Sequence, residues 1–165
     1  MPKPVTAANI FEPDFDELRS HPGQDGFEAR RARVGRQAGA RRLGASVWEL
    51  DAGQSAYPYH CHLGEEELIV VLEGRPSLRG PDGWRELAPG EVVAFPRGEE
   101  GAHQVANRTA ETIRFLSVST SGDPDIVLYL DAGKIAAAER RADGSGFGRF
   151  FFTEQSVGYW DGIDS

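Results

Sequence analysis

The chain has 165 residues, enough for one domain with a buried core and too few for two domains of ordinary size. Its formal net charge of -8 argues against nucleic acid as a partner, because a nucleic-acid-binding surface needs an excess of cationic side chains. The single cysteine excludes an intramolecular disulfide framework and is typical of a reducing compartment. We find no apolar stretch of signal-peptide or bilayer length, so we expect a cytoplasmic protein with no membrane partner.

Short strand patterns separated by turn residues run through most of the chain, and helical periodicity is nearly absent. The predicted strands cover, in chain order, residues 42–50, 67–73, 76–79, 84–88, 91–95, 112–120 and 125–130. Helical turns are expected over 12–20 and 134–141. We therefore predict an all-β fold, with an antiparallel jelly-roll barrel over 31–130 between an irregular N-terminal arm (1–30) and a C-terminal arm (131–165).

A His-x-His sequence is the strongest functional signal in the chain. Because alternate residues of a strand share a face, His60 and His62 can both point inward while Cys61 points outward. Glu67 has the wrong parity to continue the same strand without interruption, so the chain is expected to bend at Gly64, where glycine tolerates the bend. Two imidazoles followed by a carboxylate are side chains that a transition-metal ion accepts as ligands.

Three consecutive glutamates make the choice of carboxylate ligand open to argument. Counting back along the strand from the turn residue Gly74 favours Glu67. Glu65 and Glu66 are interpreted as solvated turn residues, although Glu66 also satisfies a looser form of the spacing. The sequence thus leaves Glu66 as the alternative carboxylate.

A third imidazole, His103, lies in a distant segment, after a strand that Pro96 ends and a loop that contains glycines. The two segments resemble the two motifs of the cupin superfamily, G-x5-H-x-H-x(3,4)-E-x6-G and G-x5-P-x-G-x2-H-x3-N. Here the first motif reads Gly53, His60, His62, Glu67 and Gly74, and the second reads Gly90, Pro96, Gly98, His103 and Asn107. This chain has one extra residue before His60 and two extra residues before His103.

The resemblance implies a double-stranded β-helix barrel of the kind found in small single-domain bacterial cupins. It places His60, His62, Glu67 and His103 on the four positions of the family's metal ligands. We therefore expect one divalent transition metal per chain, and this ligand set suits Mn, Fe, Co, Ni or Zn without choosing among them. Some cupins keep the barrel and have lost the metal, which is the alternative.

Members of the superfamily include dioxygenases, decarboxylases and sugar isomerases or epimerases, so the fold alone does not choose a reaction. Four protein ligands leave two positions of a six-coordinate ion for water, dioxygen or substrate. No separate general base stands near the motifs, which weakens the sugar isomerase or epimerase alternative and puts redox or oxygenase-type chemistry ahead. A non-catalytic module that binds or stores a small polar molecule is the second class of function that stays open.

Four side chains near the motifs are candidates for contact with the metal ligands: Tyr57, Tyr59, Phe95 and Gln104. Each has an alternative role as filling of the barrel interior, and for Phe95 this alternative is preferred. Six arginines form a basic cluster in this acidic protein: Arg30, Arg31, Arg33, Arg36, Arg41 and Arg42. We interpret the cluster as a solvated face with salt bridges, with anion binding or contact with a partner subunit as the alternative.

The C-terminal stretch 150–160 is rich enough in aromatic residues to pack on the barrel or on a neighbouring subunit. Open sheet edges are usually paired, covered or charged in folded proteins. We therefore expect a homodimer in which residues 36–42 or 150–160 contribute to the interface. The expected ligand is a small polar molecule rather than a macromolecule, because an eight-stranded barrel has room for about one small ligand.

Overall fold

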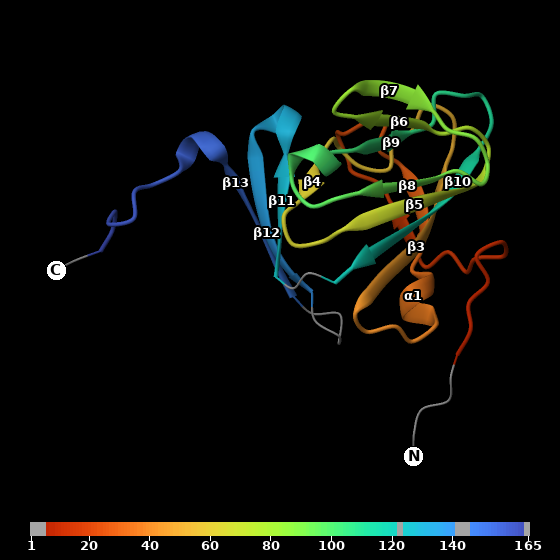
Figure 1. Ribbon diagram of the computed structural model, residues 1–165, viewed down its shortest axis with the longest axis horizontal. Coiled ribbons are helices and arrows are strands. Elements are labelled where there is room, and N and C mark those ends of the chain that lie inside the picture. The colour runs from red at the N-terminus through yellow and green to blue at the C-terminus, as the bar shows by residue number, and fades with distance from the viewer. Residues whose placement is uncertain (1–5, 122–123, 141–145, 164–165) are drawn as a thin grey trace, which may run out of the picture.

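The structure, a computed structural model, describes residues 6–121, 124–140 and 146–163 and consists mainly of strands (Figure 1). In chain order the strands are β1 (Glu17–Arg19), β2 (Ala29–Ala32), β3 (Leu43–Leu50), β4 (Cys61–His62), β5 (Glu67–Glu73), β6 (Ser77–Gly80), β7 (Gly83–Glu86), β8 (Val92–Phe95), β9 (Gln104–Ala106), β10 (Ile113–Thr120), β11 (Asp125–Tyr129), β12 (Lys134–Arg140) and β13 (Gly146–Phe152). The helical segments among these residues are α1 (Val34–Gln37), η1 (Glu99–Gly101), η2 (Leu130–Ala132) and η3 (Thr153–Gln155). The expected arms, 1–30 and 131–165, both extend beyond the described residues.

The strands form three antiparallel sheets. The largest sheet has the order β1-β2-β3-β10-β5-β8, the second β13-β12-β11-β4, and the third β7-β6-β9. This arrangement confirms the all-β prediction and is that of a double-stranded β-helix, or jelly roll. No helix in the described ranges is long and apolar enough to cross a membrane.

Strand β3 is buried on both of its faces. Trp48 and Leu50 point into the main core between the sheets, where Phe115 also lies. Val47 points to the opposite face and packs in a second cluster with Val34 of α1. Apolar residues of the N-terminal segment cover that second cluster, which explains why residues 46–50 are all buried although side chains alternate along a strand.

Both expected helical turns are wrong. Residues 134–140 form β12, which is hydrogen-bonded to β11 on one side and to β13 on the other. Part of the first expected turn is β1, which pairs with β2. The alanine-rich sequence of β12 has good local helix propensity, but pairing with two neighbouring strands satisfies its backbone groups, and such tertiary context overrides propensity.

The C-terminal part of the chain leaves the body of the protein after β13 (Figure 1). Phe150, Phe151 and Phe152 are between 48% and 62% exposed, and Tyr159 and Trp160 are exposed as well. Strand β13 is the outer strand of its sheet, with β12 as its neighbour. A sheet edge and several exposed aromatic side chains are therefore found together at this end of the protein.

Candidate metal centre

The backbone brings the two histidine-bearing segments together. His60 and His103 form an isolated antiparallel bridge, in which the N–H of His60 donates to the carbonyl of His103 at 3.1 Å and the reverse hydrogen bond measures 2.8 Å. The loop before His103, which has two extra residues, contains the helical turn η1. This turn takes up the additional length ahead of the bridge. His62 follows in β4, which pairs with β11.

The expected bend lies between β4 and β5 and brings Glu67 back to the histidines. Gly64 takes part in this bend, and its N–H donates to Oδ1 of Asp125 at 3.0 Å. A Cβ atom at Gly64 would lie 2.9 Å from the same oxygen, so glycine is needed here because the backbone closely approaches Asp125. The first residue of β5 is Glu67, as the spacing to Gly74 predicts.

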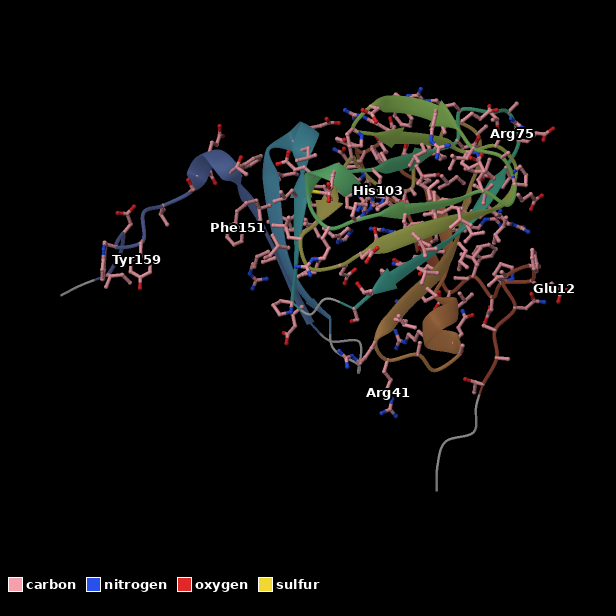
Figure 2. The ribbon with its side chains drawn as sticks, viewed as in Figure 1. Glu12, Arg41, Arg75, His103, Phe151 and Tyr159 are labelled. Atoms are coloured by element: carbon pink, nitrogen blue, oxygen red, sulfur yellow. The ribbon has the colours of Figure 1, made fainter. Side chains whose placement is uncertain are left out.

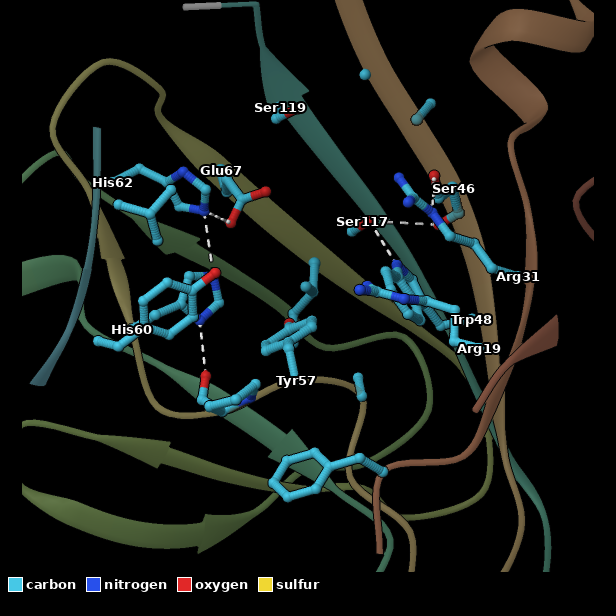
Figure 3. A pocket seen from close by; sticks show the side chains of 18 of the residues that line it. Arg19, Arg31, Ser46, Trp48, Tyr57, His60, His62, Glu67, Ser117 and Ser119 are labelled. Carbon is cyan, nitrogen blue, oxygen red and sulfur yellow. Dashed lines mark hydrogen bonds and ion pairs between the residues drawn. The ribbon is translucent and has the colours of Figure 1, made fainter. Parts of the chain in front are cut away.

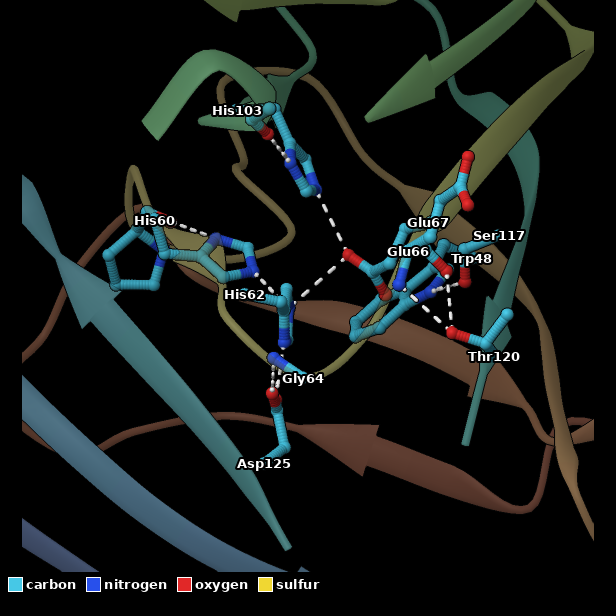
Figure 4. Close-up of polar contacts among 12 residues, drawn as sticks. Trp48, His60, His62, Gly64, Glu66, Glu67, His103, Ser117, Thr120 and Asp125 are labelled. Carbon is cyan, nitrogen blue, oxygen red and sulfur yellow. Dashed lines mark hydrogen bonds and ion pairs between the residues drawn. The ribbon is translucent and has the colours of Figure 1, made fainter. Parts of the chain in front are cut away.

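The four predicted ligands converge on one place (Figure 4). The Nε2 atoms of His60 and His62 are 3.1 Å apart. Oε2 of Glu67 lies 3.3 Å from Nε2 of His62 and 3.3 Å from Nε2 of His103. Of the two carboxylates that the sequence offers as ligand, that of Glu67 lies beside the Nε2 atoms of the histidines, whereas Glu66 is exposed. The ligand atoms of His60, His62 and Glu67 all lie within 4.8 Å of one another.

Each of the three histidines has a hydrogen-bond acceptor at its other ring nitrogen. Nδ1 of His60 lies 2.9 Å from the carbonyl of Pro58, and Nδ1 of His103 lies 3.0 Å from the carbonyl of Gly101. Nδ1 of His62 lies 2.5 Å from Oδ2 of Asp125. Because a carbonyl or carboxylate accepts only from a protonated nitrogen, these contacts favour the tautomer with the proton on Nδ1 and the lone pair on Nε2.

This donor set fits a metal ion. Lone pairs on the Nε2 atoms of His60 and His62 would face each other at 3.1 Å, an arrangement that is repulsive unless a cation or a proton lies between them. Neutral imidazoles with one carboxylate suit a divalent transition metal. The hydrogen bonds at Nδ1 are the outer contacts that orient metal-binding histidines in proteins.

The same contacts shift the acid–base equilibria of the chain without metal. Burial, together with the neighbouring His103 and His62, lowers the pKa of His60 to about 3. Burial also acts to lower the pKa of His62, but hydrogen bonds to Asp125 and Glu67 outweigh it and raise this pKa to about 10. Burial would raise the pKa of Glu67, but hydrogen bonds from His103 and His62 hold it well below its usual range. A proton on His62 thus takes the position that a cation would occupy.

Sequence reasoning missed one residue of this centre and misjudged another. Asp125, the first residue of β11, is 2% exposed and bonds to His62. Glu65, expected to be a solvated turn residue, is only 4% exposed, and that expectation is wrong. The carboxylates of Glu65 and Asp125 lie within 4.8 Å of His62. No spacing rule links Asp125 to the motifs, because it reaches them through the pairing of β11 with β4.

The four candidates for contact with the ligands divide into two pairs. Phe95 stacks on the ring of His103 with ring centroids 3.8 Å apart, and the ring of Tyr57 lies edge-on to His60 at 4.8 Å. Phe95 is also part of the buried core, which agrees with the role as barrel filling that the sequence favoured for it. Tyr59 lies under the guanidinium of Arg79, and Gln104 pairs with Arg79 in the three-stranded sheet. Tyr57 and Phe95 are therefore the two of these candidates whose rings contact the histidines.

A cavity of about 330 Å³ opens between the six-stranded and the four-stranded sheets and includes His60, His62 and Glu67 in its wall (Figure 3). Tyr57 lies beside this group, and its ring is 5.7 Å from that of Trp48. Burial raises the pKa of the Tyr57 hydroxyl, so this group is a neutral hydrogen-bond donor at physiological pH. The size is at the lower end of the range for pockets that hold small molecules.

Residues 46–119 match the family described as "Cupin domain". A solved structure from Silicibacter pomeroyi, called a sugar phosphate isomerase from a cupin superfamily, gives a TM-score of 0.75 at 26% sequence identity and covers 94% of this chain and 95% of that chain. A protein from Acidithiobacillus ferrooxidans, provisionally named a sugar phosphate isomerase, gives a TM-score of 0.73 at 26% identity over 85% of this chain and 86% of that chain. A predicted oxalate decarboxylase from Thermotoga maritima gives a TM-score of 0.57 at 22% identity over 69% of this chain and 97% of that chain. No curated protein matches this chain.

Proposed function

The chain carries a cupin domain over residues 46–119, and on this premise we propose that it is a metal-dependent isomerase of a small sugar-like molecule. In this proposal one divalent transition metal is held by the four side chains that the sequence predicts: His60, His62, Glu67 and His103. The observation that carries it is the convergence of three Nε2 atoms and one carboxylate oxygen beside a cavity for one small ligand.

The choice of an isomerase rests on the neighbouring structures. The proteins from Silicibacter pomeroyi and Acidithiobacillus ferrooxidans carry that activity in their names and are similar to this chain over most of its length. They favour the sugar isomerase alternative over the oxygenase-type chemistry that the sequence put ahead. The oxalate decarboxylase, at 22% identity, supports the fold alone.

A bound metal would polarise a carbonyl or hydroxyl oxygen of the substrate. The chain itself supplies the walls that position the rest of the molecule. Tyr57 presents a hydroxyl that stays protonated at physiological pH, and the ring of Tyr129 also lines the cavity. His60 and His62 keep their Nε2 atoms directed at the centre through the hydrogen bonds at Nδ1. In this proposal these groups would orient a polyhydroxylated ligand beside the metal.

The test is isomerisation by the full-length protein before and after removal of metal. Protein stripped with a chelator is reloaded with Mn, Fe, Co, Ni or Zn and mixed with aldoses and aldose phosphates, and the products are followed by NMR. We expect turnover to disappear on stripping and to return with metal. His62→Ala and His103→Ala should lose both stoichiometric metal and turnover while remaining folded, whereas the exposed Glu66→Gln should keep both.

Three results would overturn the proposal. Turnover that survives complete removal of metal would exclude the mechanism. Stabilisation of the fold by a sugar, without any product, would show a binding module instead of an enzyme. Oxygen uptake in place of isomerisation would restore the redox interpretation of the site.

A further inference from the structure

The wall of the cavity contains two arginines that the metal centre does not use. They come from adjacent strands, Arg19 from β1 and Arg31 from β2, and both line the cavity. Parity along β2 explains why Arg31 points inward: Arg30 lies on the opposite face of the strand, where it pairs with Glu49. The basic cluster seen in the sequence is thus divided between the outside of the sheet and the cavity.

The two guanidinium groups lie over one aromatic ring. The Cζ atom of Arg31 is 4.9 Å from the centroid of Trp48, and that of Arg19 is 5.4 Å away (Figure 3). Stacking on an indole restrains the long side chains, and a guanidinium group hydrogen-bonds through the N–H groups at its edge rather than through its face. The Nε–H of Arg31 donates to the hydroxyl of Ser46 at 3.0 Å.

Serine hydroxyls continue this polar part of the wall. Ser46 of β3 is directly opposite Ser117 of β10, and both line the cavity together with Ser119. The indole N–H of Trp48 donates to the hydroxyl of Ser117 at 3.0 Å. Strand positions that face an interior normally carry apolar side chains. Paired serines beside two arginines therefore form a polar wall with hydrogen-bonding groups for a ligand.

The charge of the nearby carboxylate does not remove the attraction for an anion. Glu17 forms ion pairs with Arg31 at 3.6 Å and with Arg19 at 3.9 Å, and it does not itself line the cavity, so the three side chains together keep one net positive charge. Arginine is suited to bidentate hydrogen bonding with phosphate, whose oxygens can accept from two guanidiniums at once. The ring of Tyr57 contacts both His60 and Trp48, the residue on which the arginines stack. One small molecule in this cavity could therefore contact the arginines at one end and the histidines at the other.

We propose that Arg19 and Arg31, with the hydroxyls of Ser46 and Ser117, bind the phosphate group of the substrate while its sugar carbon atoms lie toward His60 and His62. The proposal rests on the proposed function for the identity of the sugar portion. The phosphate subsite itself depends only on the cavity wall. The substrate class is accordingly a phosphorylated sugar rather than a free sugar.

The first experiment measures binding of inorganic phosphate to the metal-free protein by calorimetry, so that coordination to a metal plays no part. We expect wild-type protein to bind phosphate and both Arg19→Gln and Arg31→Gln to bind it about tenfold or more weakly, as for loss of hydrogen bonds to a charged group. Arg41→Gln is the matched control, because Arg41 points away from the body of the protein (Figure 2). Arg19 lies near the sheet edge, so its variant keeps the test valid if loss of Arg31 disturbs folding.

The second experiment compares a phosphorylated with an unphosphorylated substrate of the metal-loaded enzyme, glucose 6-phosphate against glucose. Arg19→Gln should raise KM for the phosphate ester about tenfold and leave KM for the free sugar unchanged, with little change in kcat. Phosphate binding that is absent from wild type, or equal in wild type and both arginine variants, overturns the subsite. Phosphate binding that depends on the arginines in a protein without isomerase activity keeps the subsite and rejects the proposed function.

Discussion

Nδ1 of His62 and Oδ2 of Asp125 are 2.5 Å apart, and this contact links the His-x-His segment to a strand far along the chain. The same carboxylate accepts a hydrogen bond from the N–H of Gly64. One side chain therefore fixes both the orientation of an imidazole and the bend that returns the chain to Glu67. Asp125 is a positioning residue, since it acts on the centre through His62.

Asp125→Asn should lower the metal affinity about 10- to 100-fold, the usual cost of losing an outer partner of a metal-binding histidine. The asparagine oxygen can still accept from Gly64, but the asparagine amide cannot accept the Nδ1 proton of His62 if that oxygen is so engaged. Competition with a chelator gives the affinity. The exposed Asp131→Asn is the control, because Asp131 pairs with Arg79 at the surface. Equal affinities for Asp125→Asn and wild type would show that Asp125 does not position His62.

Glu67→Gln should weaken metal binding far more than Glu66→Gln. Oε2 of Glu67 lies 3.3 Å from both His62 and His103, whereas the side chain of Glu66 is exposed. Elemental analysis of the two purified variants, side by side, measures the difference. Equal losses of metal, or a larger loss for Glu66→Gln, would mean that the other carboxylate is the ligand.

The stability of the metal-free protein should be greatest near pH 6.5. Below that pH the unfolded chain protonates His60, whose pKa is about 3 in the folded state, so stability falls by about 1.4 kcal/mol per pH unit from this group. Above pH 6.5 the unfolded chain loses the proton that folded His62 keeps up to a pKa of about 10, so stability falls again. Glu67, whose pKa is lowered in the folded protein, adds to this loss of stability at pH values below the usual pKa of a glutamate.

Denaturant unfolding between pH 4 and pH 9, in the presence of chelator, checks this profile. His60→Gln should reduce the loss of stability below pH 6.5 and leave the loss above pH 6.5 unchanged. A His62→Gln variant should do the reverse, because the alkaline loss arises from the proton on His62. A profile that rises steadily through pH 8 in wild-type protein would contradict the assigned protonation states.

The protein should be a homodimer at micromolar concentration, with the C-terminal arm in the interface. Phe151 and Trp160 are 55% and 74% exposed in the single chain, and we expect a partner subunit to cover them. Light scattering should show that Phe151→Ser combined with Trp160→Ser shifts the protein toward monomer. Phe11→Ser, which changes an equally exposed residue elsewhere, should not. A wild-type monomer would refute the expectation.

The sequence predicts the parts of this protein that follow from local pattern. The bounds of β3, to within one residue, and of β5 follow from apolar runs that end at turn residues, and the shared direction of His60 and His62 follows from alternation along a strand. The bend before Glu67 follows from parity alone. No local rule connects His103 to the first motif, and it is identified through the resemblance of its segment to the second cupin motif. The structure places its Nε2 atom beside Glu67.

The remaining features depend on which strands become neighbours. Asp125 reaches His62 because β11 pairs with β4, and Glu65 is buried in the same place. Arg31 reaches the cavity because β2 joins the large sheet beside β3. The helical turn expected over 134–141 fails for the same reason, since helix propensity is a local property and the partners of β12 are not.

The paired backbone hydrogen bonds between His60 and His103 have a consequence for metal exchange. They tie the two histidine-bearing segments together through the backbone, so folding of the sheets supplies energy for forming the site. Loading should therefore proceed on the native protein without refolding. Because the same scaffold receives every ion, the supply of each metal in the cell, combined with its intrinsic affinity for imidazole and carboxylate, would decide which one the protein carries.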